Sequence, residues 1–240
     1  MAYINFDNVT LRYPIYNSRG FSLRNHLLRV GTGGLIDSEV GSVNYITALK
    51  NISFKIKEGD SVGIMGHNGA GKTTLLRTIA GIYRPNSGNI AIQGKFATLF
   101  EQGACMEVDL TGYDNIYRMC LMLGIKKKEV EKKIGEIEEF TELGNFLQLP
   151  IRTYSTGMAM RLNFAISTSV EPEVLLMDEI FAAGDQAFQI KARLRLNGLI
   201  DSAKILILAS HSMEMVKEYC NRLLILEHGI LREESIKDIK

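Results

Sequence analysis

The chain has little of what marks several common classes of protein. Its 240 residues carry 28 basic and 27 acidic side chains, so the formal net charge is only +1. A nucleic-acid-binding domain usually shows a clear excess of positive charge, and we therefore expect no nucleic-acid partner. No apolar run approaches the ~18 residues that a membrane-spanning helix needs. The first residues also lack the basic segment followed by an apolar stretch that marks a secretory signal.

Cysteines are few and follow no pattern. Cys105, Cys120 and Cys220 are an odd set, and we expect reduced thiols, as in a cytosolic protein. Repeats and low-complexity tracts are also missing. The hydrophobic fraction of 46% is ordinary for a globular protein, so the chain can build one large domain, or a core with a subdomain. The charged run at 126–139 predicts a helix whose inward side carries Val130, Ile134 and Ile137.

A phosphate-binding motif follows the first strong strand signal. The run Ser61–Met65 predicts a strand, and the next residues, GHNGAGKTT, fit G-x-x-x-x-G-K-[ST] before a predicted helix. Glycines let successive N–H groups point at phosphate oxygens, and the helix presents its positive end to the same anion. We expect Lys72 to reach the β/γ-phosphates and the Thr73 hydroxyl to ligate Mg²⁺. The residues expected to hold nucleotide are Gly66, His67, Asn68, Gly69, Ala70, Gly71, Lys72, Thr73 and Thr74.

Acidic residues end a second predicted strand. Val174–Met177 are all apolar, as in a strand buried on both faces, and Asp178 and Glu179 follow directly. Asp178 is placed to hold the Mg²⁺ shell. Glu179 is placed to orient or deprotonate an attacking water. This motif is weak alone and strong beside a phosphate loop.

A histidine ends the third predicted strand. Ile205–Ala209 are apolar and His211 follows them. Ligands of open parallel sheets bind at the carboxyl ends of the strands, so the three groups are expected to share one edge. We assign His211 a catalytic role. The rings of His67 and His228 receive a structural interpretation, although His67 belongs to the phosphate loop.

A Ser-x-Gly turn opens a further predicted helix in RTYSTGMAMRLNFAIS, shortly before LLMDE. At this position the segment resembles the signature motif of ATP-binding cassette (ABC) ATPases. Thr156 and Met158 depart from the usual Leu-Ser-Gly-Gly-Gln, whereas the phosphate-contacting positions, Ser155 and Gly157, are kept. The form YSTGMAMRL, with LTGYDNIY and DEIFAAGDQAF, is similar to that of ATPases that export O-antigen, capsule or teichoic acid. We therefore expect the site to be active in ATP hydrolysis despite the altered signature.

Other residues match positions of the same family. Tyr13 in LRY matches the aromatic residue that stacks on adenine, with Tyr45 as a second candidate. Gln102 in LFEQG matches the glutamine loop, which implies contact with nucleotide and metal. Asp185 in AAGD matches the loop after the catalytic glutamate, Glu179.

The resemblance runs over nearly the whole chain and implies an α/β fold. This is a P-loop ABC-type nucleotide-binding domain with a RecA-like core, an antiparallel β-subdomain and a helical signature subdomain. We expect one domain over 1–240, with the core and β-subdomain at 1–105 and 164–240 and the helical subdomain at 106–163. ATP and Mg²⁺ are the implied cofactors. ATP would lie between the phosphate loop of one subunit and the signature of another, so a homodimer is implied.

The early segment Ser18–Gly41 lies between two stretches in which apolar and polar residues alternate, as in half-buried strands. Within it, a basic amphipathic run near 21–30 places Leu23, Leu27 and Val30 on one side of a helix, before a Gly-rich loop. So short a helix needs a surface to lie on. One interpretation is that this surface is a membrane interface or a partner's cytosolic face. Polysaccharide exporter ATPases resemble this chain in carrying such an insertion, which lies near the lipid-facing entry of the transporter. The other is the protein's own β-subdomain.

The resemblance implies an ATP-hydrolysing subunit that powers export of a lipid-linked, O-antigen-like polysaccharide. It would act through a separate multi-helix membrane permease, as a peripheral protein on the cytoplasmic face of the inner membrane. The last segment predicts a strand pair and a short tail, so we expect no C-terminal carbohydrate-binding domain. The alternatives are the ATPase of a capsule, teichoic acid or importer system, and a soluble ABC protein. A P-loop kinase would not need Ser155, Gly157 or His211.

Overall fold

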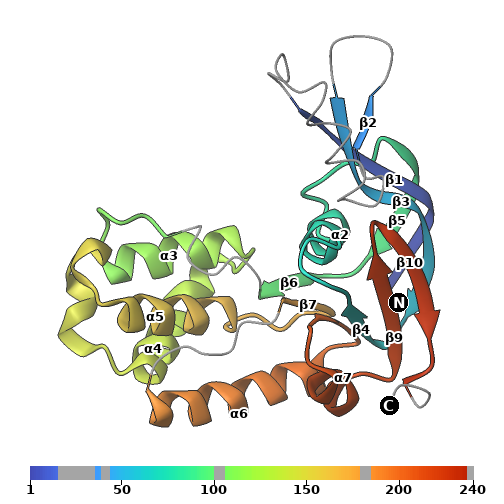
Figure 1. Ribbon diagram of the computed structural model, residues 1–240. Coiled ribbons are helices and arrows are strands. Elements are labelled where there is room, and N and C mark those ends of the chain that lie inside the picture. Colours follow the sequence, from blue (N-terminus) through green and yellow to red (C-terminus); the bar gives the residue numbers. More distant parts are fainter. Residues whose placement is uncertain (16–35, 39–43, 100–105, 179–184, 237–240) are drawn as a thin grey trace. The chain divides into compact units, whose positions relative to one another are not determined.

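The computed structural model describes residues 1–15, 36–38, 44–99, 106–178 and 185–236 (Figure 1). They form two compact units, Met1–Gly94 with Lys204–Lys240, and Lys95–Ala203, and each unit is described by itself. The amphipathic run near 21–30, Gln102 and Glu179 lie outside the described residues.

An antiparallel sheet forms one layer of the first unit. Its strands, in the order β2-β3-β1-β5, are β2 (Ile36–Ser38), β3 (Asn44–Lys57), β1 (Tyr3–Ile15) and β5 (Ser87–Gln93). The alternation seen in the sequence has the expected cause, because Phe6 and Phe54 pair across β1 and β3 and stack at 4.6 Å in the buried layer. The strand β2 was not predicted: the sequence favoured a Gly-rich loop there, and the structure pairs Asp37 with Tyr45 of β3.

A second group of strands in the same unit is mostly parallel. Its order is β10-β9-β4-β8, with bounds β10 (Ile230–Glu234), β9 (Arg222–Glu227), β4 (Ser61–Met65) and β8 (Ile205–Ala209). The predicted strands at 61–65 and 205–209 are confirmed with the same bounds. All of β8 is buried, as its apolar run indicates. Helix α2 (Lys72–Ile79) follows β4 and contacts β3 and β8, and α7 (Met213–Tyr219) contacts β4.

Two parallel strands and several helices form the second unit. The elements are β6 (Phe96–Leu99), β7 (Val174–Asp178), α3 (Gly112–Met122), α4 (Lys127–Thr141), α5 (Thr156–Ser167), α6 (Gln186–Ser202) and the 3-10 turns η1 (Gly144–Gln148) and η2 (Ile151–Thr153). Helices α3, α4 and α5 share a buried core that includes Ile116, Val130, Ile137 and Leu162. The predicted inward side of α4 is confirmed, although Ile134 is only partly buried. Within the described ranges, no helix is both long and apolar enough to cross a membrane.

Candidate functional site

The phosphate-binding motif forms the turn between β4 and α2. Gly71 is the residue before the helix and takes a left-handed conformation, with φ 108°. Gly66 has no room for a side chain, since an added Cβ would lie 2.2 Å from the carbonyl oxygen of Leu226 in β9. The glycines at these two positions are therefore required by backbone conformation and by close approach of a neighbouring strand.

Lys72 reaches back over this loop. Its ammonium donates hydrogen bonds to the carbonyl oxygens of Gly66, at 2.7 Å, and His67, at 3.3 Å. Lys72 also begins α2, whose first N–H groups have no acceptor within the helix and carry the positive end of its dipole. A fixed cation and a positive helix end at one glycine-rich loop suit a polyphosphate.

The turn between β9 and β10 supports the loop from the side. Gly229 donates a backbone hydrogen bond to the carbonyl of Ala70, at 3.3 Å. The rings of His67 and His228 lie with centroids 4.9 Å apart, and a ring nitrogen of His67 lies 2.9 Å from the carbonyl oxygen of Asn68. No sequence pattern indicates that these two histidines meet.

Tyr13 lies beside the first turn of α2. Its hydroxyl lies close enough to the side chains of Thr74 and Tyr83 for both of them to shift its pKa. Burial raises the pKa of the Tyr13 hydroxyl, and Thr74 partly offsets this. Tyr45, the second candidate from the sequence, lies in β3 opposite Pro14. Tyr13 is thus the candidate that lies next to the helix of the phosphate loop.

His211 leaves the sheet next to the phosphate loop. It follows β8, which pairs in parallel with β4 and places Ala209 opposite Ile64. The N–H of Ser210 continues the ladder to the carbonyl of Ile64, at 3.1 Å. The loop and His211, which is exposed, therefore depart from the carboxyl ends of neighbouring parallel strands.

The second unit carries Asp178, the last residue of β7, with a partly exposed side chain. It also carries the signature-like turn. Ser155 caps α5 by accepting a hydrogen bond from the N–H of Met158, at 3.2 Å. Among the described residues, a Cβ added to Gly157 would meet only the Ser155 hydroxyl, at 3.9 Å. Packing around the described residues therefore does not explain why this helical position is glycine.

An arginine that the sequence analysis passed over connects α5 with the start of α6. Arg161 donates to Asp185 at 2.6 Å, and its guanidinium carbon lies 5.0 Å from the ring centroid of Phe188. Asp185 in turn caps α6 by accepting the N–H of Phe188, at 2.9 Å. This hydrogen bond and the charge of Arg161 lower the pKa of the Asp185 carboxyl.

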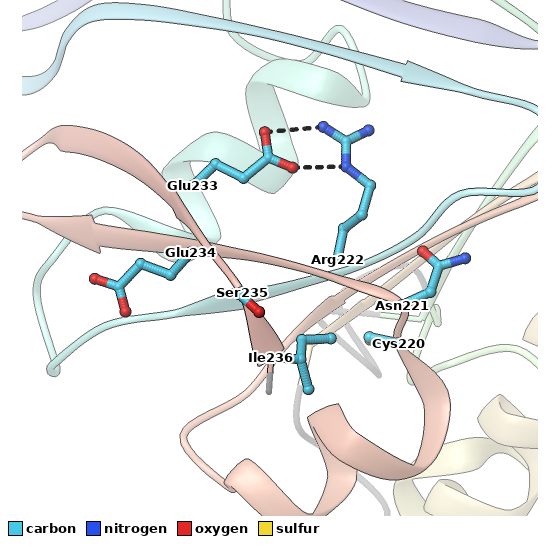
Figure 2. A pocket seen from close by; sticks show the side chains of 7 residues that line it. All are labelled: Cys220, Asn221, Arg222, Glu233, Glu234, Ser235 and Ile236. Carbon is cyan, nitrogen blue, oxygen red and sulfur yellow. Dashed lines mark hydrogen bonds and ion pairs between the residues drawn. The ribbon is translucent and has the colours of Figure 1, made fainter. Parts of the chain in front are cut away.

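A hollow of about 700 Å³ in the first unit is a different feature (Figure 2). It lies where Asn221 accepts the N–H of Ser61, at the amino end of β4, away from the loop that follows the carboxyl end. Its charges are matched: Arg222 donates to Glu233 at 2.8 and 3.1 Å, and to Asp60 at 2.7 Å. Paired charges leave little for a ligand to bind, so we do not place the active site here.

Comparison with known proteins gives the family. Residues 49–182 match the model of the ABC transporter family. The chain belongs to this family. It is 55% identical to the O-antigen export system ATP-binding protein RfbE of Yersinia enterocolitica, over 98% of the chain and 99% of that protein. It is 35% identical to RfbB, a protein of the same description from Klebsiella pneumoniae, over 96% and 92%.

Other matches extend this picture. The teichoic acids export ATP-binding protein TagH of Bacillus anthracis is 38% identical over 98% of this chain, which spans only 41% of the length of TagH. Among solved structures, an ATP-binding subunit of an ABC transporter has a TM-score of 0.70 at 20% identity, covering 98% of this chain and 90% of its own. A dimeric ATP-binding cassette bound to ADP and Pi has a TM-score of 0.69 at 23% identity, covering 98% and 100%. The predicted fold class is thereby confirmed, and the chain is an ABC-type ATPase.

Proposed function

We propose that the protein is the ATP-binding and ATP-hydrolysing subunit that powers export of a lipid-linked, O-antigen-like cell-surface polysaccharide. The observation that carries this proposal is an intact phosphate loop in a chain that matches RfbE over almost its full length. The relatives named for teichoic acid export support another polymer as the alternative.

Nucleotide binding follows from the loop geometry. We assign the phosphates to the N–H groups of the loop and to Lys72, and the adenine ring to Tyr13. Thr73 and Asp178 offer oxygen ligands, the kind that Mg²⁺ prefers, and the Gln102 amide would add a third. When bound, Mg²⁺ neutralises charge on the β- and γ-phosphates. The oxygen chemistry of this donor set fits the ion.

The proposed catalytic residues have separate roles. Glu179 would orient or deprotonate the attacking water, which is the work of a general base. His211 would contact the transferred phosphate, and its departure from the strand next to β4 supports a place near the loop. Asp185 would help to position the loop that follows Glu179, because Arg161 holds the Asp185 carboxylate by a hydrogen bond of 2.6 Å.

Gly157 supports a shared site in a homodimer. Glycine within a helix costs roughly 1 kcal/mol relative to alanine. Of the residues that the structure describes, a Cβ at Gly157 would contact only Ser155. A close approach from outside the described residues would explain the glycine. We propose that ATP held by one subunit makes this approach to Ser155 and Gly157 of the other.

The remaining assignments concern organisation. We propose one ABC ATPase domain with a helical subdomain near 106–163, supported by the core that α3, α4 and α5 share. The partner would be a separate membrane permease, and the ATPase would act on its cytoplasmic side, as the export relatives suggest.

Two linked experiments test the function. Purified wild type should gain melting temperature on addition of Mg·ATP, and Lys72→Ala should not, because the variant lacks the fixed cation at the phosphates. In a strain that lacks the chromosomal gene for this protein, expression of the wild type should restore surface polysaccharide. Expression of Lys72→Ala should leave the polymer inside the cell. An equal thermal shift in both proteins would refute ATP binding at this loop, and unchanged surface polymer in the deletion strain would refute the export role.

A further inference from the structure

Tyr83 lies in the loop that follows α2, and its partly buried ring contacts Tyr13. The two ring centroids are 5.5 Å apart and the ring planes meet at 79°. This is the edge-to-face arrangement that aromatic pairs favour, because the positive edge of one ring meets the negative face of the other.

Helix α2 fixes both tyrosines from one side. Thr74 and Arg77 are three positions apart in this helix, so they share a face. Thr74 lies next to the Tyr13 hydroxyl, whose pKa it lowers, and Arg77 donates to the Tyr83 hydroxyl at 2.9 Å. The guanidinium carbon of Arg77 also lies 5.7 Å from the Tyr83 ring centroid, within reach of a cation–π contact.

A stacking surface needs a fixed plane. A lone tyrosine can turn about two side-chain torsions, and ordering it on binding costs conformational entropy. Tyr13 is only partly buried, while its contact with the Tyr83 ring and the neighbouring Thr74 restrain it. The ring is therefore held in place before any ligand arrives.

We propose that Tyr83 is a positioning residue for nucleobase recognition, which holds the Tyr13 ring through this edge-to-face contact and so fixes the plane on which the base stacks. Arg77 secures Tyr83, and Thr74 connects this platform to the helix of the phosphate loop. The inference rests on the proposed function, since it assumes that nucleotide binds at that loop.

The effect of Tyr83 is specific to ligands that carry a base. Removing its ring should weaken ATP binding by about 3- to 10-fold, the size of one aromatic pair. Removing the Tyr13 ring should cost about 5- to 150-fold, the size of base stacking itself. Neither substitution should change the affinity for inorganic tripolyphosphate, which has no base. KM should rise while kcat at saturating ATP stays the same, because the base takes no part in the chemistry.

The experiment measures the dissociation constants of ATP and of inorganic tripolyphosphate by calorimetry, on the purified full chain with Mg²⁺. The variants are Tyr83→Ala, Tyr83→Phe, Tyr13→Ala and the double variant. Tyr3→Ala is the matched control, because Tyr3 lies on the same strand, is 40% exposed and is distant from α2 in the sheet register. The proposal predicts weaker ATP binding by Tyr83→Ala, unchanged tripolyphosphate binding, and a double variant no weaker than Tyr13→Ala alone.

Tyr83→Phe keeps the ring in case Tyr83→Ala does not fold. It should bind ATP with an affinity between wild type and Tyr13→Ala, again with tripolyphosphate unchanged. Equal weakening of both ligands, additive losses in the double variant, or wild-type affinity in both Tyr83 variants would overturn the positioning role. Failure of wild type to bind ATP would instead refute the proposed function, so the two failures are distinguishable.

Discussion

Replacement of Gly66 by alanine tests the geometry of the phosphate loop. The added Cβ would lie 2.2 Å from the carbonyl oxygen of Leu226, about 1 Å inside the ordinary contact distance for carbon and oxygen. Leu226 cannot easily yield, because β9 is paired with β4 on one side and β10 on the other. The loop itself must therefore move by about 1 Å. A displacement of that size can lower the reaction rate of a well-positioned site by about 10²-fold.

We expect Gly66→Ala to weaken ATP binding by about 10-fold or more and to destabilise the fold by about 1–3 kcal/mol, as overpacking does. The control is Gly59→Ala, which has φ 91° but open space around the added Cβ. The control therefore has backbone strain without a clash, and it should lose stability but keep ATP affinity. Calorimetric titration with ATP and thermal melting measure both effects. Wild-type ATP affinity in Gly66→Ala would refute the argument that the close approach of Leu226 shapes the loop.

Three further predictions concern other parts of the molecule. Ser155→Arg should abolish ATP hydrolysis but not monomer nucleotide binding, and mixing it with Lys72→Ala should restore at most one working site per mixed dimer; activity unaffected by the partner's mutation would contradict the shared site. Arg161→Met should lower kcat by up to about 10²-fold through displacement of Asp185 and lower the melting temperature. The N–H of Phe188 and the charge of Arg161 both lower the pKa of Asp185 in the fold. The part of the stabilisation that comes from Arg161 is present above the ordinary pKa of aspartate and is lost as pH falls through the folded value. The melting difference should therefore shrink in acid, and a pH-independent gap would count against the ion pair. Burial raises the pKa of Cys220 to about 12, so at pH 8 only roughly one thiol in 10⁴ is thiolate; mass spectrometry should show slow alkylation until urea is added, and equal rates with and without urea would contradict the burial.

Local signals were enough to predict several elements. The strands at 61–65 and 205–209 were predictable because each is an apolar run between turn-forming residues. The start of α5 was predictable because a serine hydroxyl satisfies a free N–H at a helix end. The glycines of the phosphate loop were predictable as a motif, although the particular clash at Gly66 depends on where β9 passes.

Contacts between distant parts of the sequence could not be predicted in the same way. The pair of Tyr13 and Tyr83 forms only once β1 lies beside α2, and His67 meets His228 only through the turn after β9. The bond between Arg161 and Asp185 needs the start of α6 to lie against α5. Strand β2 has three residues and gains its hydrogen bonds from β3, so no periodic pattern could mark it.

Hydrolysis by Glu179→Gln tests the central claim that this chain is an ATPase with a general base after β7. The substitution removes the base and keeps the shape of the side chain, so ATP should still bind. Turnover, measured as released phosphate beside wild type, should fall by roughly 10²–10⁴-fold, with ATP-bound dimer accumulating. Wild-type turnover in this variant would contradict the account, because another group would then position the water.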